Sequence, residues 1–259
     1  GFPLKWQMDV VKPLLSRSAG KTPFHWSGPQ IRLKMRPWNL AAIGFRTEGN
    51  HHLGYATAKT SESAKLKMGA GYGELQFGHD GVLQELTFTV EGAALETAQA
   101  QNYRFTQLNA RLDLDRPTSP ESKPHQVPAL RLTAELFGLT LPKGMKPALG
   151  RTISRIALST DFLGVANGPN LQQTLSQWAR SGGALNVKQL EIGWSKLDIS
   201  GTGTLALDSA LQPIAAFSGR VSGYDETLDA MANGGLIKPA TAMVTRFALR
   251  ALSNFTGDK

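Results

Sequence analysis

The fold is decided by residues 185–207, which read LNVKQLEIGWSKLDISGTGTLAL. On both sides of Ser195-Lys196, apolar and polar residues alternate with a period of two, as in half-buried β-strands. We therefore predict a strand over 185–194, a short turn, and a second strand over 197–207 that pairs with the first. Gly201 and Gly203 share the apolar face of the second strand, where glycines favour strong curvature or the close approach of another element.

The same alternation recurs along most of the chain. It is clear in residues 4–10, 31–36 and 64–68, whose polar faces are largely cationic. His79-Asp80-Gly81 predicts a tight hairpin turn, because Asp-Gly between alternating runs favours that geometry. Further strands are predicted at residues 74–77, 83–90, 103–115, 130–136 and 214–221.

Three short segments have helical features instead, at residues 170–181, 225–232 and 240–253. Long strands with few helices predict a mainly β (α+β) fold, as a large curved antiparallel sheet or a folded-over half-barrel with two or three short helices. We expect one elongated β-rich domain over residues 1–259. The proline-rich loop 117–128 could divide it into sub-lobes 1–116 and 129–259.

The composition describes a folded chain with an uneven charge. Of the 259 residues 41% are hydrophobic and 19% charged, which excludes disorder over most of the length, and none is cysteine, which excludes disulfides and thiolate chemistry. The net charge is +8, and residues 1–67 hold 11 basic against 3 acidic side chains, so that the remainder is neutral. A focused positive field favours an anionic partner, namely a lipid headgroup, lipopolysaccharide phosphate, nucleic acid or an acidic protein.

Motifs for an enzyme are weak. Ala19-Gly20-Lys21-Thr22 looks like the end of a phosphate-binding loop, but Leu15 stands where that motif needs glycine, and Pro23 follows where a helix must begin. Ser18 and Lys21 fit a Ser-x-x-Lys pattern without its Lys-Thr-Gly partner. We therefore predict no enzymatic activity, no catalytic residue and no cofactor.

We also predict no metal site. Glu48, His51 and His52 form a local trio, but adjacent residues of a strand point to opposite faces, and a solvated loop pair is the simpler interpretation. Carboxylates at the start of the predicted helix 225–232 complement the helix dipole, which explains them without catalysis.

Aromatic residues lie among the N-terminal cations, which makes nucleic acid a candidate partner. Aromatic platforms beside cations suit single-stranded nucleic acid; here they are Trp6, Phe24, Trp26, Trp38 and Tyr55. Trp6, however, alternates in phase with apolar neighbours, which places it in a core. We therefore expect no nucleic acid partner.

A lipid interpretation uses the same strands differently. A sheet with one continuous apolar face must cover it with helices, a second sheet or an apolar ligand, and three short helices are few for such a sheet. A folded-over sheet that packs on itself stays an open alternative. The expected apolar groove is lined by Leu4, Trp6, Met8, Val10, Ile31, Leu33, Met35, Leu66, Met68, Leu185, Val187, Leu197, Ile199, Leu205 and Leu207. Contacts to an anionic surface are expected from Lys5, Arg32, Lys34, Arg36, Lys65 and Lys67.

Several motifs carry a family resemblance, and they cover most of the chain. They are Gly1-Phe2-Pro3-Leu4-Lys5-Trp6, Arg36-Pro37-Trp38, residues 178–183 (WARSGG), 190–194 (LEIGW) and 203–208 (GTLALD), and Gln212-Pro213. Together they resemble an alphaproteobacterial envelope family catalogued as a domain of unknown function. Its members carry one membrane-anchoring helix before a periplasmic β-rich domain. In architecture that family is similar to AsmA-like envelope proteins, which build curved sheets with an apolar inner face and are in several cases linked to lipid movement.

The resemblance implies a periplasmic domain, tethered to the inner membrane by an N-terminal helix absent from this chain. We expect it to bind or transfer a lipid or other apolar ligand, with its basic surface facing anionic lipid or the membrane. The alternative is a non-enzymatic envelope scaffold or adaptor that binds a protein partner. A third class, a polysaccharide-binding or polysaccharide-processing enzyme, would require an open polar cleft with facing carboxylates.

Overall fold

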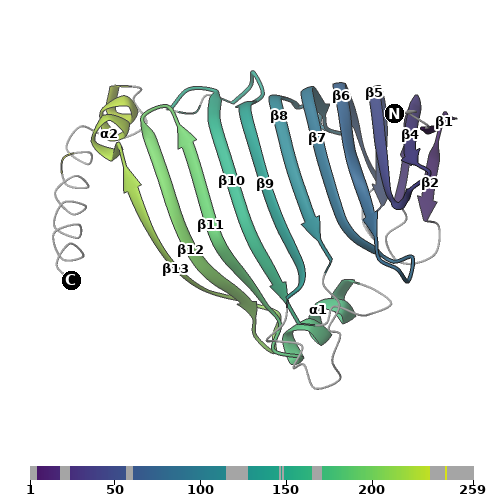
Figure 1. The fold of residues 1–259 in the computed structure, drawn as a ribbon. Helices are drawn as coiled ribbons and strands as arrows, with labels where there is room; N and C mark the ends of the chain where they lie inside the picture. Colours follow the sequence, from purple (N-terminus) through teal and green to yellow (C-terminus); the bar gives the residue numbers. More distant parts are fainter. Residues whose placement is uncertain are drawn as a thin grey trace.

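The computed structural model describes residues 5–17, 24–56, 61–114, 128–145, 147, 149–164, 171–233 and 243. They form one antiparallel sheet of 13 strands with two short helices (Figure 1). The strands are β1 (Trp6–Val11), β2 (Leu14–Arg17), β3 (Phe24–Ser27), β4 (Gln30–Arg36), β5 (Asn39–Ala56), β6 (Ser61–Phe77), β7 (Leu83–Glu96), β8 (Asn102–Asp113), β9 (Pro128–Thr140), β10 (Thr152–Leu163), β11 (Ala184–Trp194), β12 (Leu197–Leu207) and β13 (Pro213–Ser222). The helices are α1 (Leu171–Arg180) and α2 (Tyr224–Asn233).

The sheet is open. Its order is β1-β4-β5-β6-β7-β8-β9-β10-β11-β12-β13, while β2 and β3 pair with each other and β3 joins the far end of β5. The predicted fold class is confirmed: this is a large curved antiparallel sheet with short helices, and not a closed barrel. The 185–207 hairpin is also confirmed, since β11 and β12 pair from Trp194 opposite Leu197 back to Ala184 opposite Ala206.

Most predicted elements lie where the alternation placed them. In the predicted turn between β6 and β7, Asp80 Oδ1 accepts a hydrogen bond from the main-chain N–H of Val82 at 3.0 Å, and Gly81 has a φ of 74°. The predicted loop 117–128 falls outside the described residues except Pro128, and the predicted helix 240–253 falls outside them except Met243. β8 nevertheless pairs with β9 across that loop, so the sheet continues between the two halves of the chain.

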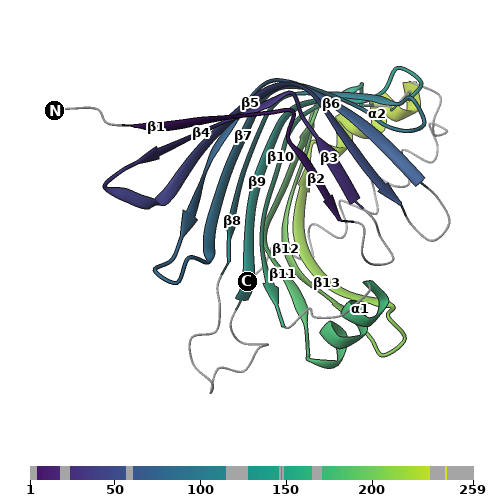
Figure 2. The same cartoon turned by 90° about the vertical axis from the view of Figure 1, so that its right-hand side faces the viewer.

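A line of backbone irregularities bends the N-terminal half of the sheet. Gly49 in β5, Gly92 in β7 and Gly138 in β9 have φ of 89°, 59° and 62°, a region that only glycine adopts easily. In the register, Gly92 lies level with Gly69 of β6, and Gly138 lies level with Thr106 of β8. Figure 2 shows β5 and β6 passing over the top of the sheet and descending on both sides. We call residues 50–56, 61–68, 93–96 and 102–105 the short limb.

The tightest packing lies inside this bend. Val90 is 1% exposed and packs with Met68 and Ala93 of the short limb. Partly buried residues surround them, namely Leu66, Phe88, Phe105 and Leu108. Because apolar side chains from both sides of the bend meet here, the apolar face of the sheet is the concave one, and the opposite face is convex.

Helix α1 is attached to the C-terminal half of the sheet by one buried side chain. Trp178 stacks on Phe162 of β10 with ring centroids 5.0 Å apart, and its indole N–H donates to the carbonyl of Leu163 at 2.6 Å. The helix ends where Gly182 has a φ of 72° and the N–H of Gly183 donates to the Trp178 carbonyl. The predicted helix over 170–181 and its stop are therefore confirmed.

Candidate functional site

Three rows of cross-strand partners cross the concave face from β1 to β13. In each row every residue is the direct partner of the next, so all share one face. The first row is Trp6, Met35, Ile43, Leu75, Leu86, Leu112, Leu132, Thr160, Val187, Gly203 and Phe217. The second is Met8, Leu33, Phe45, Gly73, Phe88, Ala110, Ala134, Leu158, Leu190, Gly201 and Gly219. The third is Val10, Ile31, Thr47, Gly71, Val90, Leu108, Leu136, Ile156, Ile192, Ile199 and Val221. No residue in these rows is charged.

The concave face is only half buried. Leu132 and Leu158 in its middle and Ile199 of β12 are partly exposed, and within the described residues no second layer lies over them; the helices α1 and α2 pack against β12. Over this stretch the described sheet is therefore a single layer.

The concave face is long enough for an extended apolar molecule. The sheet path contains eleven strands, and strands lie about 4.8 Å apart, so the rows extend over about 48 Å. This exceeds the hydrocarbon thickness of a bilayer, which is about 30 Å. The face therefore offers a continuous apolar track rather than a pocket for one small ligand.

The residues predicted for the groove lie on this face, in two groups. Those of β1, β4 and β6 are at one end and those of β11 and β12 at the other. Leu4 falls outside the described residues. Met68 and Val187, at 6% exposure each, are packed into the interior and do not line an open surface. The expectation that Trp6 sits in a core was wrong: it lies on the edge strand and is 56% exposed.

Sequence reasoning missed the middle of this face. The residues that join the two predicted groups are in β7 to β10, for example Phe88, Leu112, Leu132 and Ile156. Their alternation was visible in the sequence, but the order of strands in the sheet was not. The register is what makes them neighbours of the predicted residues.

The convex face carries polar side chains and ladders of ion pairs. Arg155 of β10 bridges Glu135 of β9 at 2.6 Å and Glu191 of β11 at 2.5 Å. Asp161, nearly buried, pairs with Lys188 at 2.7 Å. Such partly exposed pairs contribute little to stability each, but they commit the convex face to solvent. The two faces of the sheet are therefore chemically opposite.

All six cations predicted to contact an anionic surface are exposed; five project from the polar side of β4 or β6, and Lys5 directly precedes β1. Arg32 is partly neutralised, because its guanidinium donates to Asp9 at 2.9 Å; the pair lowers the pKa of Asp9 and raises that of Arg32. Lys5, Lys34 and Arg36 surround one shallow pocket of about 190 Å³ near the turn that joins β4 and β5. The N-terminal end of the sheet is thus cationic on its convex side.

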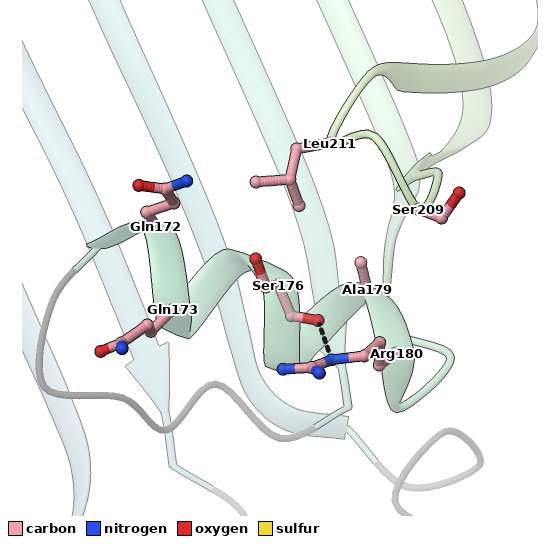
Figure 3. Close-up of a pocket in the computed structure, with 7 residues that line it drawn as sticks. All are labelled: Gln172, Gln173, Ser176, Ala179, Arg180, Ser209 and Leu211. Atoms are coloured by element: carbon pink, nitrogen blue, oxygen red, sulfur yellow. Dashed lines mark hydrogen bonds between the residues drawn. The ribbon is translucent and has the colours of Figure 1, made fainter.

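A second hollow lies beside α1, with a volume of about 570 Å³ (Figure 3). Ser209 and Leu211, in the turn after β12, lie on one side, and α1 lies on the other. Among the described residues that line it, Arg180 is the one with a titratable side chain, and its Nε donates to the Ser176 carbonyl at 3.2 Å. The described residues of this lining include no carboxylate, and so none of the facing carboxylates that a polysaccharide-processing enzyme would need.

The histidine pair was predicted to be a solvated loop pair, and this was wrong for one member. Both residues lie in β5; His52 is exposed, whereas His51 is 1% exposed and stacks on Trp26 with centroids 5.7 Å apart. Burial is the main cause that lowers the pKa of His51, and the nearby His52 adds to it. Within the described residues, no three His, Asp or Glu side chains are grouped so that they could hold a metal ion.

The whole chain, residues 1–259, matches a family described as uncharacterized protein conserved in bacteria (DUF2125). The chain belongs to this family. The expected membership of a domain-of-unknown-function family is therefore confirmed. Searches of curated proteins and of solved structures return no match. In the part of this DUF2125 chain that the structure describes, no helix has the length and apolar character needed to cross a bilayer.

Proposed function

We propose that this protein is a non-enzymatic, periplasmic lipid-binding or lipid-transfer protein that holds its apolar ligand on the concave face. The observation that carries the proposal is the set of three uncharged rows from β1 to β13, which extend over about 48 Å and are partly exposed at most positions. An acyl chain laid on such a surface gains about 0.8 kcal/mol for each buried CH₂ group. An apolar surface that no described element covers is accordingly stabilised by an apolar ligand.

The resemblance to alphaproteobacterial envelope proteins and to AsmA-like architecture supports the periplasmic assignment and the tether to the inner membrane. The curved sheet with an apolar inner face agrees with that resemblance in architecture. We further propose that the exposed cations of the N-terminal strands, such as Lys65 and Lys67, face anionic lipid or the membrane surface. No cofactor and no nucleic acid belong to this proposal.

The test places one charge on either face of the same strand. Leu132 lies in the first concave row between Leu112 and Thr160, and the next residue, Thr133, is exposed on the convex face between Arg111 and Ser159. Leu132→Glu should abolish retention of lipid, measured by native mass spectrometry and by extraction of the purified protein. Thr133→Glu is the matched control and should retain the wild-type load.

Two outcomes would count against lipid binding. The first is wild-type protein that neither carries lipid after purification nor takes it up from vesicles. The second is an equal load in both glutamate variants, with both folded by circular dichroism. Either result would mean that the concave face is not where an apolar ligand is held.

One observation favours the alternative of an envelope scaffold or adaptor. All of β13 is exposed, it ends the sheet, and Ile214 and Phe217 project from it at 58% and 55% exposure. An open edge of this kind can accept a strand from a protein partner. Loss of a purified partner on Ile214→Lys, with the lipid load unchanged, would support the scaffold function.

A further inference from the structure

Exposed apolar side chains gather at the turn between β4 and β5. Trp38 at the tip of this turn is 65% exposed, and Leu40, just beyond it, is 57% exposed. The turn is closed where Arg36 pairs with Asn39. Trp6 of the edge strand is the partner of Met35, next to the same turn, and is also exposed. Figure 2 shows this turn projecting at the left of the sheet, beyond the turn between β6 and β7.

Cations surround the same turn. Lys5, Lys34 and Arg36 converge on one pocket of about 190 Å³, which Asn39 of the turn also lines. Among the described residues that line the pocket there is one carboxylate, that of Glu74, which accepts a hydrogen bond from Gln76 at 3.0 Å. The surroundings therefore remain net positive, in the part of the chain that holds the whole charge excess.

We propose that the β4–β5 turn is a membrane anchor: Trp38 and Leu40 insert into the interface of an anionic bilayer while Lys5, Lys34 and Arg36 hold its headgroups. Tryptophan is the side chain that best occupies the boundary between headgroups and acyl chains. Basic residues beside it are attracted by the negative surface potential of an anionic membrane. The charge of the tip and that of such a membrane are complementary.

The side chains at the tip favour a bilayer over nucleic acid. Single-stranded nucleic acid binds by stacking of bases on aromatic faces, and Leu40 offers no such platform. A bilayer interface uses all three kinds of group present, namely an indole, an aliphatic chain and cations. Because β1, β4 and β5 also begin the uncharged rows, an anchored tip would place one end of the concave face at the lipid surface.

The inference that the membrane supplies the lipid rests on the proposed function. Binding of the β4–β5 turn to a bilayer can be measured independently of it. The probe is flotation with vesicles of phosphatidylglycerol, compared with vesicles of phosphatidylcholine. Lys34→Gln with Arg36→Gln should weaken binding about fivefold for each charge removed. Trp38→Ser with Leu40→Ser should weaken it by roughly tenfold, since two apolar side chains no longer insert.

The matched control lies at the opposite edge of the sheet. Ile214→Ser removes an exposed apolar residue of β13 that lies outside the three rows, and Arg220→Gln removes a cation from the same strand. These variants should bind phosphatidylglycerol vesicles as the wild type does. All substituted positions are exposed, so circular dichroism should show the same fold throughout.

These measurements distinguish the membrane anchor from lipid binding on the concave face. Two results would overturn the anchor. The first is wild-type protein that does not float with phosphatidylglycerol vesicles. The second is tip variants that bind these vesicles as well as the β13 control variants do. Selective loss in the tip variants, with lipid load by native mass spectrometry unchanged, supports it. Leu132→Glu protein that has lost its lipid should still float with the vesicles.

Discussion

The N-terminal region, β1 to β9, and the C-terminal region, β10 to β13 with its two helices, share one face and differ in almost everything else. The uncharged rows run through both without interruption. The N-terminal region is bent by positive-φ glycines and begins with the cationic residues 1–67, which hold 11 basic against 3 acidic side chains, whereas no positive φ is found inside β10 to β13. The C-terminal region instead carries a helix fixed by a buried tryptophan.

This comparison shows that the alternation of apolar and polar residues alone produces the apolar face. Other residues determine how sharply the sheet bends and which of its ends is charged. Glycine at the bend lets strands turn sharply and close part of the face on itself, around Val90. Charge on the convex side then distinguishes one end of the track from the other. Four substitutions test this division of roles.

The largest effect is expected from Trp178→Ala in the C-terminal region. The side chain is 5% exposed, stacks on Phe162 and donates a hydrogen bond to the Leu163 carbonyl. Its loss should lower the free energy of unfolding by about 3–5 kcal/mol, because a large aromatic is removed and a buried carbonyl is left without its donor. Chemical denaturation measures this, and Gln172→Ala on the exposed side of α1 is the control, with an expected change near zero.

Gly73→Ala should have the next largest effect, and it lies in the N-terminal region. A Cβ at Gly73 would collide with the Thr87 carbonyl oxygen and come within 2.7 Å of the Phe45 ring. Overpacking against main chain costs about 2–3 kcal/mol. Gly44→Ala is the matched control on the neighbouring strand, where the nearest atoms would be 3.7 Å away.

These two variants also test whether the regions fold together. Because β8 and β9 are paired, Trp178→Ala and Gly73→Ala should each shift one common unfolding transition. If each variant moved a separate transition, the sub-lobes 1–116 and 129–259 on either side of the proline-rich loop would unfold independently. The contrast between them would then be one of stability as well as of charge and curvature.

Much of the fold could be predicted from the amino-acid sequence, and the features that could not be predicted have physical causes. The β11–β12 hairpin was predictable because alternation, turn and length are all local properties. The close approach expected at Gly203 is also present: a Cβ there would collide with the Phe217 ring of β13. The exposure of Trp6 was not predictable, because alternation gives the face of a strand but not whether anything covers it.

The bend was missed for a different reason. Gly49, Gly92 and Gly138 are far apart in sequence and look unremarkable one by one. They form a line only in the register of the folded sheet, where phase changes in neighbouring strands coincide. Likewise, the candidate site could be predicted at its two ends but not in its middle, since strand order depends on long-range pairing.

Gly92→Ala tests the bend with a smaller effect. A Cβ at this position would meet nothing within 4 Å, so the cost is that of a side chain at a φ of 59° alone. That cost is about 1–2 kcal/mol. Thermal unfolding should show it, and Gly144→Ala, in an open turn without positive φ, should leave the melting temperature unchanged. Equal stability of both variants would mean that the positive φ is not what maintains the bend.

The smallest expected effect is the pH dependence of the free energy of unfolding, which is at most about 1.4 kcal/mol per pH unit for one proton. It depends on buried titratable side chains, of which each region contains one example. Asp161 in β10 is paired with Lys188, whereas His51 in β5 has no charged partner within the described residues, and burial lowers its pKa. Thr47 donates its hydroxyl proton to the Gln30 carbonyl at 2.7 Å, so Nε2–H of His51 is the donor in its 3.3 Å contact with Thr47. Nδ1 then carries no proton, and its protonation would create a buried donor with no acceptor.

The lowered pKa of His51 determines how the stability of the protein changes with pH. His51 titrates near pH 6.5 in the unfolded chain and lower in the folded one, so its contribution is present above pH 6.5 and is lost as the pH falls below it. Urea unfolding between pH 8 and pH 5 should therefore show a decline that begins near pH 6.5. His51→Phe keeps a ring against Trp26 and should flatten this decline, while His52→Gln, at the exposed neighbour, should retain most of it. A decline of the same size in His51→Phe would assign the acid sensitivity to other groups and leave the two regions alike in this respect.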